Sequence, residues 1–75
     1  MKIKPGKYKH YKGGEYEVLG IAIHNETLEE LVVYRALYES AEFGKNALWV
    51  RPLSRFIEML EIDGKMVPRF EPVIK

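Results

Sequence analysis

Cysteine is absent from this 75-residue sequence. Its absence excludes disulfide bonds, thiolate catalysis and zinc sites built from cysteine ligands. Small secreted domains usually depend on disulfides, so a short chain without them is expected in a reducing compartment, and we expect a cytoplasmic protein. No apolar run approaches the length of a membrane span, and the first residues lack the apolar stretch of a signal peptide. We therefore expect no association with membranes.

The chain is also too short for two domains, so we expect one domain over residues 1–75. Apolar residues make up 47% of the sequence and aromatic residues 12%, which provides a core and argues against disorder. A domain of this size buries only about 60% of the surface of its open chain, so this core is thin. A thin core and a lone edge strand are compatible with a monomer or a weak homodimer.

The net charge of +1 conceals an asymmetry along the chain. Residues 1–12 hold five lysines and no acid, whereas the rest of the chain is mildly acidic. A basic first strand could attract a phosphate or a carboxylate, and nucleic-acid binding through it is one functional alternative. The simpler interpretation is a solvated lysine-rich edge that resists aggregation.

Short β-branched and aromatic runs alternate with turn residues, which is typical of an antiparallel β protein. Gly20 lies in the middle of a long predicted strand over residues 15–24, where a bend would let a small sheet curl. We predict a mainly β fold: a small SH3-like antiparallel barrel of five or six short strands, with one helical turn near residues 52–56.

The first hairpin is predicted to turn at Gly13-Gly14, as a two-residue loop. This register places Lys12 opposite Glu15 and His10 opposite Glu17. It also directs Tyr8 and His10 to the solvent face, and the expected core-facing residues are Tyr11, Tyr16 and Val18.

Residues 53–62 can be interpreted in two ways, because their apolar residues fit both helical spacing and strand alternation. We favour one helical turn followed by a strand to Ile62, with one full helix on a four-stranded sheet as the alternative. Asp63-Gly64 then predicts a hairpin into a last strand over residues 65–70, which belongs at an edge because Pro68 cannot donate a hydrogen bond.

Catalytic and metal-binding signals are weak. Neither serine lies in a glycine-flanked elbow, and no glycine-rich phosphate loop is present. The candidate metal ligands are His10, His24 and Glu26, but seven strand residues, about 23 Å, separate Glu17 beside His10 from His24. We therefore expect no metal and no cofactor. His24 and Glu26 could act as a general base and its orienting group, so a small hydrolase or lyase remains an alternative, and enzymatic activity is not favoured.

Aromatic and cationic side chains are interleaved on adjacent predicted strands. Trp49 and Arg51 share one face, so a guanidinium stacked on the indole is expected. For the hydrolase alternative, Arg35, Arg51 or Arg69 could hold a substrate anion. Our main hypothesis is a non-catalytic binding module for a small anionic or planar ligand, or for a short peptide. The candidate ligand-binding residues are Tyr8, His10, His24, Glu26, Tyr34, Trp49 and Arg51.

The order of several motifs resembles one protein family. They are Tyr8-x-His10-Tyr11-Lys12-Gly13, Tyr16-x-Val18, His24-x-Glu26-Thr27-x-Glu29, Val32-Val33-Tyr34-x-x-Leu37-Tyr38, Leu48-Trp49-Val50-Arg51-Pro52, Phe56, and Asp63-Gly64-x-x-Val67-Pro68-Arg69-Phe70. In these motifs, which span nearly the whole chain, the sequence is similar to the small bacterial proteins of domain of unknown function family 1653. The resemblance implies a compact, mostly β domain in a bacterial cytoplasm, and it implies no established activity.

Overall fold

The computed structural model describes residues 3–73 and is mainly β, with 58% of the residues in strands and 6% in a helix. Its elements are β1 (Gly6–His10), β2 (Glu15–Ile23), β3 (Glu30–Ala36), β4 (Glu39–Ser40), β5 (Gly44–Lys45), β6 (Leu48–Pro52), α1 (Leu53–Phe56), β7 (Met59–Ile62), β8 (Lys65–Pro68) and β9 (Phe70–Pro72). The predicted mainly β fold is therefore confirmed.

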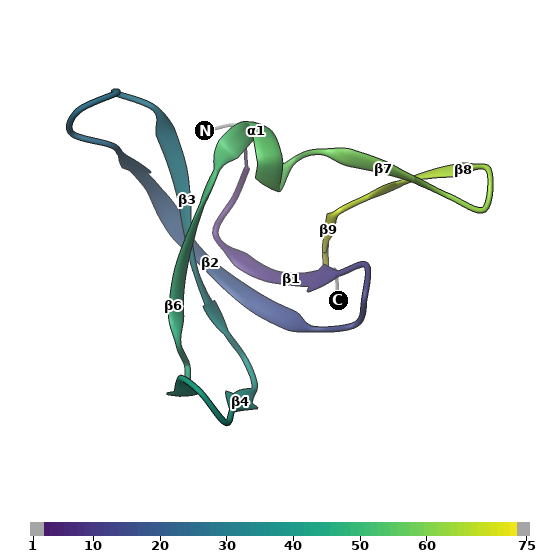
Figure 1. Cartoon of the computed structure of the whole chain (residues 1–75), viewed down its shortest axis with the longest axis horizontal. Helices are drawn as coiled ribbons and strands as arrows, with labels where there is room; N and C mark the ends of the chain where they lie inside the picture. The colour runs from purple at the N-terminus through teal and green to yellow at the C-terminus, as the bar shows by residue number, and fades with distance from the viewer. Residues whose placement is uncertain (1–2, 74–75) are drawn as a thin grey trace.

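Five of the strands form one antiparallel sheet in the order β6-β3-β2-β1-β9, and this sheet curls around the core (Figure 1). The β7–β8 hairpin forms a separate two-stranded sheet that projects from the body, and β4 and β5 form another small pair. The register between β2 and β3 shifts between Val18 and Gly20, at the predicted bend. Such a bulge increases local twist, which explains the strong curl.

The structure also decides how residues 53–62 fold. The single turn α1 ends at Phe56, and the chain becomes extended again in β7. The helical turn followed by a strand is thus confirmed, and the alternative of one full helix is wrong. Leu53 and Phe56 are the buried residues of this turn, so it serves to place two apolar side chains on the core.

The predicted register of the first hairpin is wrong. The turn spans four residues, from Tyr11 to Gly14, and β1 pairs with β2 so that Tyr8 lies opposite Tyr16 and Lys9 opposite Glu15. The shift is odd, and an odd shift exchanges the two faces of a strand. Tyr8 and His10 therefore face inward and Tyr11 is exposed, because this register buries the ring of Tyr8 while it aligns lysines with glutamates.

The predicted last strand over residues 65–70 is split in the structure. β8 ends at Pro68, and β9 crosses to the main sheet, where it pairs with β1. Arg69 lies between the two strands: its N–H donates to the Glu58 carbonyl at 2.9 Å, and its carbonyl accepts from the Tyr11 N–H at 3.0 Å. The chain can leave the hairpin here because Pro68 lacks the donor that would continue the ladder.

The core lies on the concave face of the curled sheet. Phe56 of α1 and Phe70 of β9 stack at 4.1 Å between ring centroids, with their planes 3° apart. This stack ties the helical turn to the last strand. The buried cluster consists of Ile3, Tyr8, Val18, Val32, Tyr34, Leu53, Phe56 and Phe70.

Candidate functional site

Three of the seven predicted site residues come together in the structure. His10 at the end of β1, Tyr34 in β3 and Arg51 in β6 all reach the concave face near Phe70. Strand alternation places them there, because each lies on the inward-facing side of its strand. The other four candidates lie elsewhere.

Tyr8 is a core residue. Its ring is 8% exposed and meets the ring of Phe56 edge-on at 5.5 Å. Its hydroxyl donates to the Lys4 carbonyl at 2.9 Å, so its polar end is already satisfied by the main chain. This side chain has the contacts of a structural tyrosine.

His24 and Glu26 lie in the turn between β2 and β3. The Nδ1 atom of His24 accepts hydrogen bonds from the backbone N–H groups of Glu26 at 3.2 Å and Thr27 at 3.3 Å. The imidazole therefore holds the turn, and the Glu26 side chain is exposed. The structure does not bring this pair together as a base and its orienting carboxylate.

Trp49 does not stack with Arg51, so that expectation is wrong. The indole instead meets the ring of Phe43 edge-on at 5.2 Å, while the guanidinium of Arg51 lies 5.6 Å from the ring centroid of Phe70. Both side chains leave β6 on the same face, but β6 is an edge strand, and its two ends contact different parts of the molecule.

The site contains four residues beyond the predicted candidates: Tyr16, Glu58, Arg69 and Phe70. Tyr16 was predicted to face the core but not to belong to a site, and the position of Phe70 depends on the split of the last strand, which distant pairing sets. The sequence indicated Arg69 only as one of three arginines that could hold an anion. We call the complete set the arginine–tyrosine site: His10, Tyr16, Tyr34, Arg51, Glu58, Arg69 and Phe70.

Phe70 is the centre of the aromatic part of this site. The rings of His10, Tyr16 and Tyr34 surround it edge-on, at centroid distances of 4.9, 5.6 and 5.7 Å. Edge-to-face packing of this kind holds each ring in one orientation. The polar groups of the site are therefore mounted on a rigid frame.

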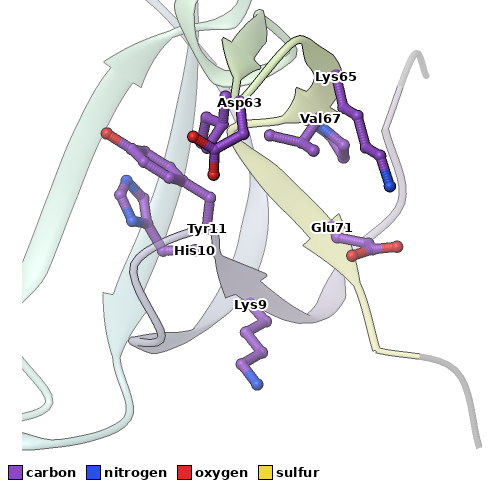
Figure 2. A pocket seen from close by; sticks show the side chains of 9 residues that line it. Lys9, His10, Tyr11, Asp63, Lys65, Val67 and Glu71 are labelled. Carbon is purple, nitrogen blue, oxygen red and sulfur yellow. The ribbon is translucent and has the colours of Figure 1, made fainter.

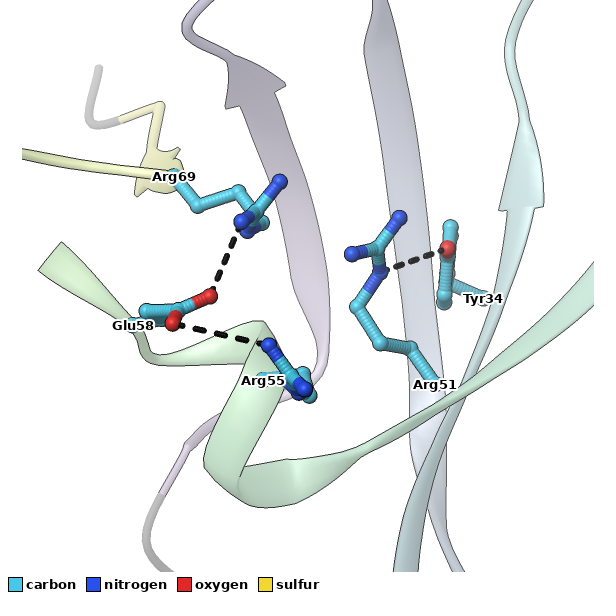
Figure 3. Close-up of polar contacts among 5 residues, drawn as sticks. All are labelled: Tyr34, Arg51, Arg55, Glu58 and Arg69. Atoms are coloured by element: carbon cyan, nitrogen blue, oxygen red, sulfur yellow. Dashed lines mark hydrogen bonds and ion pairs between the residues drawn. The ribbon is translucent and has the colours of Figure 1, made fainter. Parts of the chain in front are cut away.

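Two guanidinium groups converge beside this frame. Arg51 donates from Nε to the Tyr34 hydroxyl at 3.4 Å, and one of its outer nitrogens lies on the side of Arg69 (Figure 3). Arg69 donates to a Glu58 carboxylate oxygen at 2.8 Å, and the other oxygen of that carboxylate is 3.8 Å from Arg55. The hydrogen bond from Arg69 holds the pKa of Glu58 below its usual value.

The positive charge of the site exceeds its negative charge. Among residues 3–73, Glu58 is the carboxylate that pairs with Arg69, and Arg51 has no carboxylate partner. Arg69 is 20% exposed, and its Nε atom is a buried donor that finds no acceptor within the described chain. A buried unpaired donor on a cation is costly, so Arg69 has one unsatisfied hydrogen-bonding group in this site.

The positive charge of the site also affects the pKa of His10. Burial lowers the pKa of His10 below 6.5, and the positive charges of Arg51, Arg69 and Lys12 lower it further. Its Nδ1 atom accepts from the Lys12 backbone N–H at 3.1 Å, so the neutral ring carries its proton on Nε2. The imidazole is thus a neutral donor beside two cations.

One further tyrosine extends the polar rim. The hydroxyls of Tyr16 and Tyr38 are 2.9 Å apart, and the rings meet edge-on at 5.6 Å. Burial and this hydrogen bond raise the pKa of Tyr16, so its hydroxyl stays protonated and can donate.

His10 also lines a groove of about 580 Å³ between the end of β1 and the β7–β8 hairpin (Figure 2). Lys9 and Lys65 lie along this groove together with Asp63 and Glu71, so its charges are mixed. Because these charges offset one another, the groove itself has no preference for an anion. The excess of one sign lies at the arginines.

The described residues lack two other features. Within residues 3–73 no group of three or more histidine, aspartate or glutamate side chains is placed to hold a metal ion. The same residues also contain no helix with the length and apolar character of a membrane span.

Comparison with known proteins gives a family but no activity. The family described as "Protein of unknown function (DUF1653)" matches residues 6–72. A crystal structure of a DUF1653 protein from Bordetella bronchiseptica is 39% identical in sequence and superimposes with a TM-score of 0.83, covering 95% of this chain and 87% of the other. A search of curated proteins found no match.

Proposed function

The chain belongs to the DUF1653 family of proteins of unknown function, and we propose that it is a non-catalytic module that binds a small oxyanion-bearing ligand. The ligand class is a carboxylate or phosphate attached to a planar group. The supporting observation is that Arg51, Arg69 and His10 converge on a frame of aromatic rings with Glu58 as their carboxylate.

The arginines fit the anionic part of such a ligand. A guanidinium presents parallel N–H donors that match the two oxygens of a carboxylate or phosphate. Arg51 is held at its Nε end by Tyr34 and over the ring of Phe70, so its outer nitrogens are oriented before a ligand arrives. This preorganisation reduces the entropy lost on binding.

The aromatic rim fits the planar part. The hydroxyls of Tyr16 and Tyr38 share one hydrogen bond, which leaves one hydroxyl hydrogen free to donate, and the exposed ring of Tyr11 packs against His10 at 4.6 Å. Rings of this kind stack on planar groups of many types. The same chemistry accommodates the terminal carboxylate of a short peptide.

The nucleic-acid alternative has less support. Lys7 pairs with Glu15 at 3.3 Å, and Glu17 pairs with Arg35 on the same outer face. These acids offset the basic strand, so a phosphate backbone gains little there. Within the described part of the chain, no contact of His24 or Glu26 favours the hydrolase alternative.

The proposal is tested by NMR titration of ¹⁵N-labelled protein with inorganic phosphate, a nucleoside monophosphate, benzoate and a short peptide. We expect saturable shifts at His10, Arg51 and Arg69 for at least one of them. Arg51→Gln should weaken binding about 10- to 100-fold, because a hydrogen bond to a charged group contributes roughly 1.5–3 kcal/mol.

Arg55→Gln is the matched control. It removes the same charge from a side chain that is 67% exposed, and it should change the affinity little. Equal affinity of the Arg51→Gln protein and the unsubstituted protein, or no saturable shift with any of the four ligands, would refute the proposal.

A further inference from the structure

The free edge of β6 is the other unusual feature of this surface. β6 ends the five-stranded sheet, with β3 on one side and no strand beyond it within residues 3–73 (Figure 1). Two of its apolar side chains are highly exposed to solvent: Leu48 is 67% exposed and Val50 is 60% exposed. Natural proteins usually protect such an edge with a lysine, a proline or a bulge.

The opposite edge shows this protection. β9 is three residues long, carries Glu71 and ends at Pro72. In β6 the proline comes last, and the strand's one charged residue, Arg51, points to the concave face. The residues Leu48 to Val50 thus form an unprotected apolar edge.

The hydrogen-bond pattern shows which groups of this edge are available. The N–H of Ala36 in β3 donates to the Ala47 carbonyl at 2.9 Å, just before β6 begins. Alternation along an antiparallel pair then directs the backbone groups of Trp49 and Arg51 towards β3, and those of Leu48, Val50 and Pro52 towards the free side. Pro52 agrees with this assignment, because a residue without an N–H is tolerated where no neighbouring strand needs one.

We propose that the β6 edge pairs with the β6 edge of a second copy of this chain, in antiparallel register about a two-fold axis at Val50. The two Val50 residues then exchange N–H···O=C bonds. The N–H of Leu48 donates to the Pro52 carbonyl of the second copy. By symmetry, the N–H of Leu48 in the second copy donates to the Pro52 carbonyl of the first. Pro52, which has a backbone carbonyl but no N–H, therefore serves in this pairing as an acceptor only.

The side chains favour this register over its neighbours. With Val50 on the axis, Trp49 lies opposite Arg51 of the second copy, and an aromatic ring beside a cation is attractive. An axis at Arg51 would oppose two guanidinium groups, and an axis at Trp49 would place Arg51 opposite Ala47 and lose the contact. On the outer face Val50 lies beside Val33, so the apolar strip continues from one sheet into the other.

The natural lack of cysteine makes a direct test possible. In this register the two copies of Val50 face each other as a hydrogen-bonded pair about 5.5 Å apart at Cα, a distance that a disulfide between cysteines substituted there would span. Val50→Cys protein, oxidised in air, should form a covalent dimer at least about tenfold faster than Met66→Cys protein. Met66 is the matched control because it is also 60% exposed and lies in β8, away from the β6 edge.

The second measurement is the mass of the unsubstituted protein by light scattering after size exclusion, from micromolar to about 1 mM. We expect a concentration-dependent rise from 8.8 kDa towards twice that mass, and Val50→Lys should abolish the rise without unfolding the protein. Equal cross-linking of the two cysteine variants, or a monomer at every concentration, would overturn the proposal. Neither result depends on ligand binding at the arginine–tyrosine site.

Discussion

His10 occupies the position where the arginine–tyrosine site and the neighbouring groove meet. Its ring contacts Tyr11 on one side and Phe70 on the other. Burial lowers the pKa of His10 most, and the nearby charges of Arg51, Arg69 and Lys12 lower it further, so its neutral form is favoured. The pKa of this imidazole therefore changes when the local charge changes.

This setting gives a pH dependence with a defined sign. The pKa of His10 is lower in the folded state than its ordinary value of 6.5, so the unfolded chain takes up the proton first as the pH falls. The free energy of unfolding should therefore decrease as the pH falls from about 7.5 to 5.5. Urea denaturation across this range measures it.

His10→Gln should remove this part of the slope, whereas His24→Gln, which replaces the other histidine, should retain it. A bound anion should also raise the pKa of His10, because it offsets the arginine charges. An NMR titration of the imidazole with and without inorganic phosphate measures that shift. A pH slope that survives in the His10→Gln protein would contradict the assignment.

At the scale of the elements, the β7–β8 hairpin depends on its turn. Ile62 pairs with Lys65, and between them Asp63 and Gly64 both have positive φ, at 52° and 80°. This conformation is strained for a residue with a Cβ atom, so Gly64→Ala should destabilise the protein by about 1–2 kcal/mol. Thermal or urea unfolding provides the measurement.

Gly20→Ala is the control for this substitution. A Cβ atom at Gly20 meets no atom within 4 Å, and its φ is not positive, so the change in stability should stay within about 0.5 kcal/mol. If the two variants lost equal stability, the effect would come from glycine replacement in general and not from the turn.

The two glycine turns show which parts of the fold could be predicted from the sequence. Asp63-Gly64 fixes its own hairpin because both residues adopt the required backbone locally. Gly13-Gly14 permits loops of two or four residues, and the choice is made by burial of Tyr8 against Phe56, a residue 48 positions further along the chain.

The residues of the site likewise fall into those that the sequence could predict and those that it could not. Tyr34 and Arg51 could be predicted because each lies in a strand whose alternation is evident in the sequence. Arg69 and Phe70 could not, because their positions depend on the chain leaving β8 to pair with β1. That pairing joins the two ends of the chain, and no local pattern specifies it.

At the scale of the whole molecule, Phe70 connects elements from both ends of the chain. It is 5% exposed, stacks on Phe56, and lies in β9, which pairs with β1. Phe70→Ala should lower the free energy of unfolding by about 3–5 kcal/mol, a large part of the total for a domain of this size. Urea unfolding followed by circular dichroism measures the loss.

Phe43→Ala is the matched comparison, since Phe43 is 58% exposed and packs on Trp49 alone among the aromatic rings of residues 3–73. It should lose less than about 1 kcal/mol. A similar loss in the two variants would mean that β9 contributes little to holding the sheet together.

The position of Arg69 also has a mechanical consequence. Its main chain forms one hydrogen bond with Glu58, just before β7, and another with Tyr11, just after β1. Its side chain meanwhile binds the carboxylate of that same Glu58. A change in the angle between the β7–β8 hairpin and the sheet would therefore move the Arg69 guanidinium relative to that of Arg51.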